Sequence, residues 1–213
     1  MVAQGIELYQ RNFWRALLLG LPVAVVDQLV TGLSIPEKSA ALVAASPFFS
    51  LAYAGACAIR QNERPPLRVW LSAVALGVLT FLPAALLFPW FAIVSVLWLG
   101  LAGHAVPVVM AERPAPVAAL RRTIVLGRAD YIHAAGSFAT LAILFAITRY
   151  TLGLLLASQA DAAVRVAIFL ADLVMSPLLF LGASIVYVDL VARVGLSREE
   201  RRRLRLGVTG EAK

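Results

Sequence analysis

The chain has 213 residues, of which 61% are hydrophobic and only 15% are charged. Soluble domains carry about 25% charged residues, and an apolar run of about 20 residues is long enough to cross a bilayer. This composition argues against a soluble enzyme and predicts one polytopic membrane domain. The basic residues behind the net charge of +7 lie mostly between apolar runs. Membrane topology and anionic headgroups therefore explain them better than a nucleic acid partner does.

The apolar runs predict an all-α fold with six transmembrane helices. Residues 1–12 are expected to form a short cytoplasmic lead-in or interfacial helix. The first apolar run is interpreted as an uncleaved helix and not as a signal peptide, because it is long and no small-residue cleavage motif follows it closely. At a rise of ~1.5 Å per residue, each helix can span the ~30 Å hydrocarbon core. The helices are expected at residues 13–33, 40–59, 68–87, 90–111, 131–156 and 163–189, with a basic tail at 193–213.

The distribution of positive charge predicts the orientation of these helices. With six helices and an inside N-terminus, sixteen of the nineteen basic residues lie on the inner side. Only Lys38, Arg149 and Arg165 remain on the outer side. Cytoplasmic loops of membrane proteins carry an excess of Lys and Arg. Both termini are therefore expected in the cytoplasm.

The longest break between apolar runs, residues 106–131, predicts an amphipathic interfacial helix between helices four and five. Pro116 suits a first helical turn, and Val117, Leu120 and Ile124 repeat at helical spacing with arginines off that stripe. The segment either orients the protein among headgroups or binds a partner. The expected headgroup or partner contacts are Arg113, Arg121, Arg122 and Arg128 here, and Arg201, Arg202 and Arg203 in the tail.

Three ionisable side chains fall inside the predicted spans, where an unpaired charge is costly. Asp27, Arg149 and Asp172 all fall in the outer half of the bilayer when their positions are converted to depth. We expect them to form one polar cluster, to which Gln28 and Thr148 can add hydrogen bonds. The cluster is either a polar site for a proton or a headgroup, or a structural ion pair that joins helices one, five and six.

The sequence holds no pattern that predicts catalysis, a cofactor or a metal. His104 can relay protons, but without another His, Cys or carboxylate in its helix it is better explained by packing. His133 is expected at the inner interface as a headgroup contact. No His, Cys and carboxylate spacing matches a metal site, and Ser184 lacks the setting of an intramembrane serine protease. We therefore expect a protein that is not an enzyme.

Two stretches of the chain resemble a known group of proteins. The matching positions are Pro107, Glu112, Arg113, Ala119, Leu120, Arg122, Leu126 and Arg128 in the linker, and Tyr187, Asp189, Leu190 and Arg193 at the exit of helix six. Val191 stands where the group has Arg. In the group's pattern, a proline ends helix four and a Glu-Arg pair follows.

The group with this pattern comprises bacterial six-helix membrane proteins. It includes the membrane domain fused to glycerophosphodiester phosphodiesterases and the YciC-like inner-membrane proteins. The resemblance covers helices four to six. It implies a multi-pass protein of the bacterial inner membrane with a role near lipids or the envelope. It implies no phosphodiesterase activity, because the chain has no such domain.

Two functional hypotheses follow. The first is a non-catalytic membrane protein whose basic inner face contacts anionic headgroups of the inner leaflet, a second copy of the chain or a membrane partner. The second is a small transporter or channel that uses Asp27, Arg149 and Asp172. A water-filled cavity that reaches these three residues favours transport. A dry, sealed ion pair favours the first hypothesis.

Overall fold

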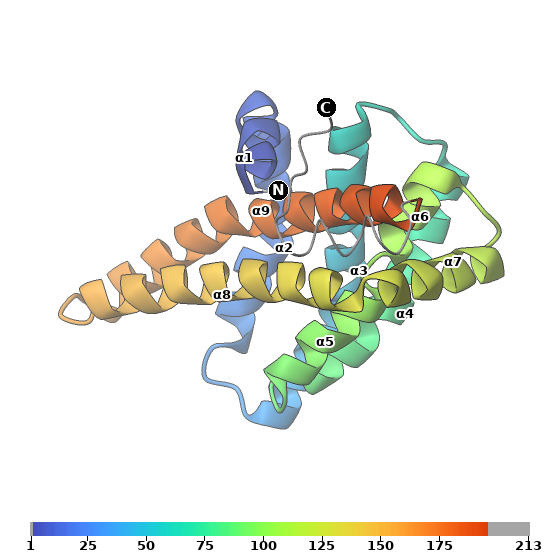
Figure 1. Ribbon diagram of the computed structural model, residues 1–213. Coiled ribbons are helices and arrows are strands. Elements are labelled where there is room, and N and C mark those ends of the chain that lie inside the picture. Colours follow the sequence, from blue (N-terminus) through green and yellow to red (C-terminus); the bar gives the residue numbers. More distant parts are fainter. Residues whose placement is uncertain (1, 196–213) are drawn as a thin grey trace, which may run out of the picture.

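The computed structural model of the chain describes residues 2–195, which contain helices and no strands. Six helical segments are long and apolar enough to cross a membrane, as the sequence predicts. The helices, shown in Figure 1, are α1 (Val2–Arg11), α2 (Phe13–Val30), α3 (Ile35–Gln61), α4 (Leu67–Leu87), α5 (Ala92–Ala102), α6 (Ala105–Glu112), α7 (Pro116–Ala129), α8 (Tyr131–Leu155) and α9 (Asp161–Val194).

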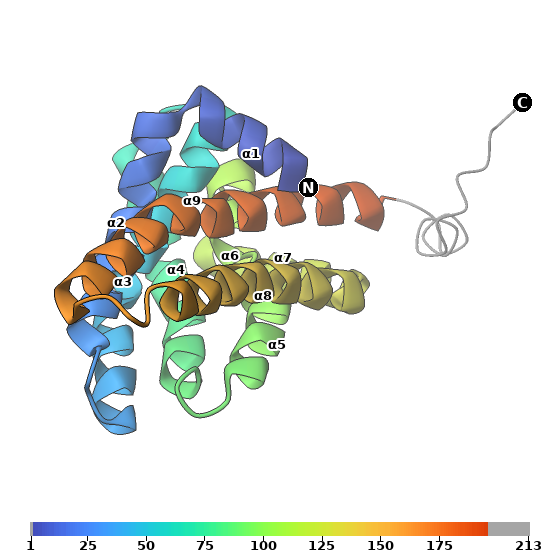
Figure 2. The ribbon, with the colours of Figure 1, turned by 90° about the vertical axis from the view of Figure 1, so that its left-hand side faces the viewer.

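The helices run in two main directions. In both views, α8 and α9 form a hairpin that crosses the helices α2 to α5 instead of running alongside them (Figures 1 and 2). α9 packs against α2, α3 and α8, whereas α8 packs mainly on α5 and α9. The turns α2–α3, α4–α5 and α8–α9 lie toward the lower left of Figure 1, and the turns α3–α4 and α6–α7 lie toward its upper right. The molecule therefore has two opposite ends.

The second transmembrane helix begins five residues earlier than the predicted 40–59. Ser34 forms a capping box with Glu37, in which the Ser34 backbone N–H and hydroxyl both donate to the Glu37 carboxylate at 2.8 and 2.7 Å. Pro36 lies in the first turn, where a missing N–H costs nothing. Residues 35–39, which precede the predicted helix, therefore belong to its first turns. The last helix also extends beyond the predicted 163–189, so that it includes Arg193.

The fourth span is broken, which corrects the prediction of one helix over 90–111. α5 ends at Ala102, and α6 begins at Ala105 after a turn at Gly103 and His104. Proline cannot donate a hydrogen bond to the carbonyl four residues before it. Pro107 therefore leaves the Gly103 carbonyl without its helical donor. Pro107 lies in the first turn of α6 and does not end the helix, contrary to the family pattern.

α7 confirms the predicted helix between the fourth and fifth spans, and the structure shows which of its faces packs against the protein. The side chains of Val117 and Ile124 are exposed, by 66% for Val117. The buried residues are Ala119, Thr123, Leu126 and Gly127. A Cβ on Gly127 would lie 2.3 Å from the Leu101 carbonyl oxygen, so small residues allow α7 to approach α5 closely. The bulkier Val and Ile side chains are left facing outward.

Close packing of α2 on α9 depends on another glycine. A Cβ on Gly20 would lie 2.2 Å from the backbone carbonyl oxygen of Leu173 and 3.0 Å from Pro177. Such contact requires a residue without a side chain. Because Asp172 precedes Leu173 and Asp27 lies two turns after Gly20, this approach brings the two aspartates toward the same place.

Candidate functional site

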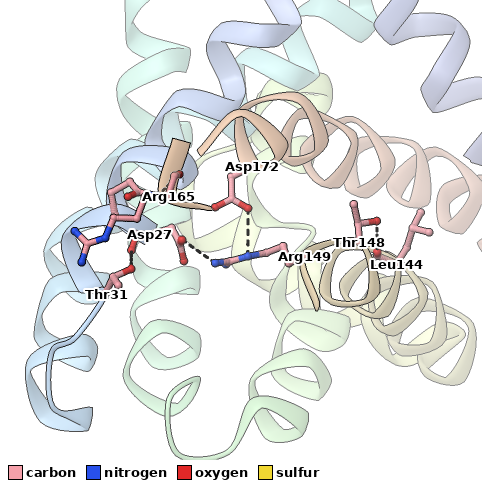
Figure 3. A network of polar contacts seen from close by, with 8 residues as sticks. Asp27, Thr31, Leu144, Thr148, Arg149, Arg165 and Asp172 are labelled. Carbon is pink, nitrogen blue, oxygen red and sulfur yellow. Dashed lines mark hydrogen bonds and ion pairs between the residues drawn. The ribbon is translucent and has the colours of Figure 1, made fainter. Parts of the chain in front are cut away.

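The structure brings Asp27, Arg149 and Asp172 together, and we call these residues the triad. Asp27 comes from α2, Arg149 from α8 and Asp172 from α9. A guanidinium nitrogen of Arg149, Nη2, donates to Asp27 Oδ2 at 2.7 Å, and Arg149 Nε lies 3.4 Å from Asp172 Oδ1. Figure 3 shows the arginine reaching between the two carboxylates. The guanidinium group also lies 5.8 Å from the ring centre of Phe145.

The triad is largely shielded from its surroundings. The side chain of Asp172 is 0% exposed, that of Asp27 is 17% exposed and that of Arg149 is 32% exposed. α2 and α8 make few other contacts with each other, so the arginine is the main link between them. The geometry is that of a partly buried ion pair with a fully buried second carboxylate behind it.

Gln28 and Thr148 do not join the triad, which corrects our expectation. The Gln28 side-chain amide donates to the backbone carbonyl of Arg165, and the Thr148 hydroxyl donates to the carbonyl of Leu144 in its own helix. Figure 3 shows Thr148 beside Leu144, on the far side of the Arg149 backbone from Asp27. A threonine in an apolar helix readily bonds the carbonyl four residues earlier, so its hydroxyl is already engaged.

His104 lies at the break between α5 and α6 and is completely buried. Its ring packs 5.6 Å from that of Phe138, centre to centre. The ring nitrogens make no hydrogen bond of regular geometry in the described residues. These contacts are those of a packing residue.

The two stretches that carry the family resemblance contact each other. The Tyr187 hydroxyl of α9 donates to Glu112 Oε1 of α6 at 3.0 Å, and Arg122 Nε of α7 donates to the same carboxylate at 3.1 and 3.2 Å. The Arg60 guanidinium lies 5.9 Å from the centre of the Tyr187 ring. Glu112 therefore ties three helices together, and Arg122 is partly neutralised rather than free for a headgroup.

A second cluster joins α9 to the start of α8. His133 Nε2 lies 2.5 Å from Asp189 Oδ2, and Arg193 Nε donates to the same oxygen at 2.8 Å. Arg193 Nη1 also lies 3.4 Å from Asp130 Oδ2. His133 thus contacts a carboxylate of the protein, whereas we expected it to contact headgroups. Asp130 is a member that the sequence did not single out, because its partner is 63 residues away.

The remaining predicted arginine contacts divide into paired and unpaired residues. Arg113 bonds Glu63 at 2.6 Å, a partner that only the fold brings near. Arg121 and Arg128 of α7 are exposed and have no ion pair among the described residues. Arg64 and Arg68, beside the α3–α4 turn, are exposed and unpaired in the same range. We call these four unpaired residues the arginine face. Arg201, Arg202 and Arg203 lie outside the described residues.

An apolar cavity of about 120 Å³ lies between α1, α8 and α9. Gly5 of α1, Leu141 of α8, and Leu178 and Gly182 of α9 contribute to its lining. The chain's sole cysteine, Cys57, is buried elsewhere in the core. Within residues 2–195, no group of three His, Cys, Asp or Glu side chains is placed to hold a metal ion.

Comparisons of this chain with family models, with curated proteins and with solved structures found no match. The six apolar helices define a protein that is compatible with multi-pass membrane insertion.

Proposed function

We propose that the protein is a non-catalytic inner-membrane protein that contacts anionic lipid through the arginine face. The observation that carries this proposal is the combination of Arg64, Arg68, Arg121 and Arg128, all exposed and without an ion pair in the described part of the chain. Unpaired cations beside a membrane attract anionic headgroups by about 1 kcal/mol each.

Apolar side chains beside the arginine face support the same proposal. Leu67, next to Arg68, is 73% exposed, and Val117, Ile124 and Val125 of α7 are exposed as well. In water such a surface would be unfavourable. At a bilayer surface, the apolar groups enter the acyl region while the arginines meet headgroups, as in other interfacial helices.

The orientation that fits this proposal places the arginine face and both termini in the cytoplasm, following the excess of positive charge on that side. The proposal also extends the family resemblance to this chain. It is supported by the contact between Glu112 and Tyr187, because the two stretches that resemble the bacterial inner-membrane group meet there.

Native mass spectrometry from mild detergent tests the lipid contact. We expect the protein to retain phosphatidylglycerol in preference to phosphatidylcholine when both are supplied in equal amounts. Changing Arg64, Arg68, Arg121 and Arg128 together to Gln should remove that preference. The control is the double change of Lys38→Gln and Arg165→Gln, which removes two basic residues near the opposite turns. Equal retention of the two lipids by the unmodified protein would contradict the proposal.

A small transporter or channel is the second candidate function, and the triad is the observation that favours it. Polar and ionisable groups inside membrane spans commonly mark ion and proton pathways. The low exposure of Asp172 and Asp27 instead favours a sealed cluster. Proton uptake by sealed vesicles that contain the purified protein decides between them. A transporter predicts uptake that Asp27→Asn abolishes.

A further inference from the structure

The triad carries an imbalance of charge. When all three groups are ionised, Asp27 and Asp172 contribute two negative charges and Arg149 contributes one positive charge. A net negative charge in apolar surroundings is unfavourable unless a proton or a cation neutralises it. The ion pairs alone therefore leave the cluster one positive charge short.

Asp172 is the carboxylate that lacks a compensating positive charge. Arg149 contacts Asp27 at 2.7 Å but lies 3.4 Å from Asp172, so Asp27 has the better ion pair. The Asp172 side chain is fully buried, and neither of its carboxylate oxygens accepts a hydrogen bond in the described residues. Figure 3 shows this carboxyl group directed toward Arg149. A buried, ionised carboxylate without hydrogen bonds is strongly disfavoured, whereas its neutral, protonated form costs much less to bury.

Other charged groups near this end do not restore the balance. Glu37 and Lys38 lie at the start of α3, and Asp161 and Arg165 lie in the first turns of α9. Glu37 is engaged by Ser34. None of the four makes an ion pair with the triad in the part of the chain that the structure describes. Figure 3 shows the Arg165 side chain pointing away from Asp172.

We propose that Asp27 and Asp172 together hold one exchangeable proton, so that the triad is a proton-binding site within the membrane-spanning part of the protein. Binding forms one O–H bond on a carboxylate oxygen, and release returns the proton to water, without oxidation or reduction. Asp27 is the entry point because it is the more exposed carboxylate. This site is separate from the arginine face and does not depend on the lipid proposal.

Infrared spectroscopy of the full-length protein in lipid vesicles tests the site, since a protonated carboxyl group has its own C=O band. Aspartate labelled with ¹³C at the side-chain carboxyl separates aspartate from glutamate. We expect one protonated aspartate at neutral pH, where exposed aspartates are ionised. Asp172→Asn and Asp27→Asn should each remove this band, because one carboxylate then balances Arg149. Arg149→Gln should enlarge the band, because no cation remains. The control Asp161→Asn should leave it unchanged.

Three results would overturn the proposal. The first is the absence of the aspartate band from the unmodified protein at neutral pH. The second is a band that persists at full size in a folded Asp27→Asn variant, which is the milder change because Asp27 is partly exposed. The third is loss of the band when Na⁺ replaces choline as the only cation in the buffer, because the site would then bind a metal cation in place of the proton.

Discussion

The two ends of the molecule differ in whether their charged side chains are buried and paired or exposed and unpaired. At the triad, charged groups are fully or partly buried, in contact and unequal in number. At the arginine face, cations are exposed and have no ion pair among the described residues. The comparison shows that the burial of a charged side chain determines whether it needs a partner within the protein. A buried charge must be matched within the protein or by a bound ion, whereas an exposed charge remains available to the medium.

Replacing Arg149 should have the largest effect on stability. Arg149→Ala leaves two carboxylates close together without a cation, and it removes the main link between α2 and α8. Removing one partner of a fully buried ion pair costs about 3–5 kcal/mol. Arg149 and Asp27 are partly exposed, so we expect a loss at the lower end, about 3 kcal/mol. Thermal unfolding in detergent measures this loss. Arg165→Ala, at an exposed residue without an ion pair in residues 2–195, is the control. An equal shift in Tm for both variants would show that the ion pairs of the triad do not stabilise the fold.

Gly20 should be next in sensitivity, because it sets the distance between α2 and α9. Gly20→Ala places a methyl group 2.2 Å from the Leu173 carbonyl oxygen, so the helices must separate. Overpacking of this kind costs about 2 kcal/mol. The unfolding temperature should fall, while Gly153→Ala in α8, which has nothing within 4 Å of the new methyl group, should leave it unchanged. The close approach is not needed if both variants keep the original Tm.

A smaller loss is expected at the hydrogen bond between Tyr187 and Glu112. Tyr187→Phe removes the hydroxyl donor, while Arg122 still holds the carboxylate. The expected cost is about 1 kcal/mol. Tyr150→Phe is the matched control, because the Tyr150 side chain is 70% exposed and makes no hydrogen bond among the described residues. Thermal unfolding in detergent measures this loss. An unchanged Tm for Tyr187→Phe would mean that Arg122 alone is enough to hold Glu112.

The smallest effect on stability is expected at the arginine face. Arg121→Gln with Arg128→Gln should leave the Tm within error, because exposed side chains away from packed contacts contribute little. The same variant should retain less phosphatidylglycerol in native mass spectrometry. A clear loss of stability without a change in lipid retention would show that these arginines stabilise the fold and do not bind lipid.

Much of the fold can be predicted from the sequence because a bilayer permits few backbone structures. An apolar run must form a helix there to satisfy its backbone, so the number of spans and the helix from Pro116 are readable from the chain. The depth of Asp27, Arg149 and Asp172 along their runs also indicates that they can meet. Helix boundaries were less predictable at Ser34, where a capping box extends α3, and at Pro107, whose missing N–H breaks the fourth span.

The tertiary structure decided which of the polar groups are paired and which helix faces are packed. Asp130, Glu63 and Asp189 gain partners from distant elements, and no local pattern reveals such contacts. The packed face of α7 likewise depends on the backbone approach that Gly127 allows to α5, a property of two surfaces rather than one. Sequence alone determined the six-helix membrane class, since hydrophobicity is a local property. Only the fold placed one arginine between two aspartates, because geometry between helices determines ion pairing.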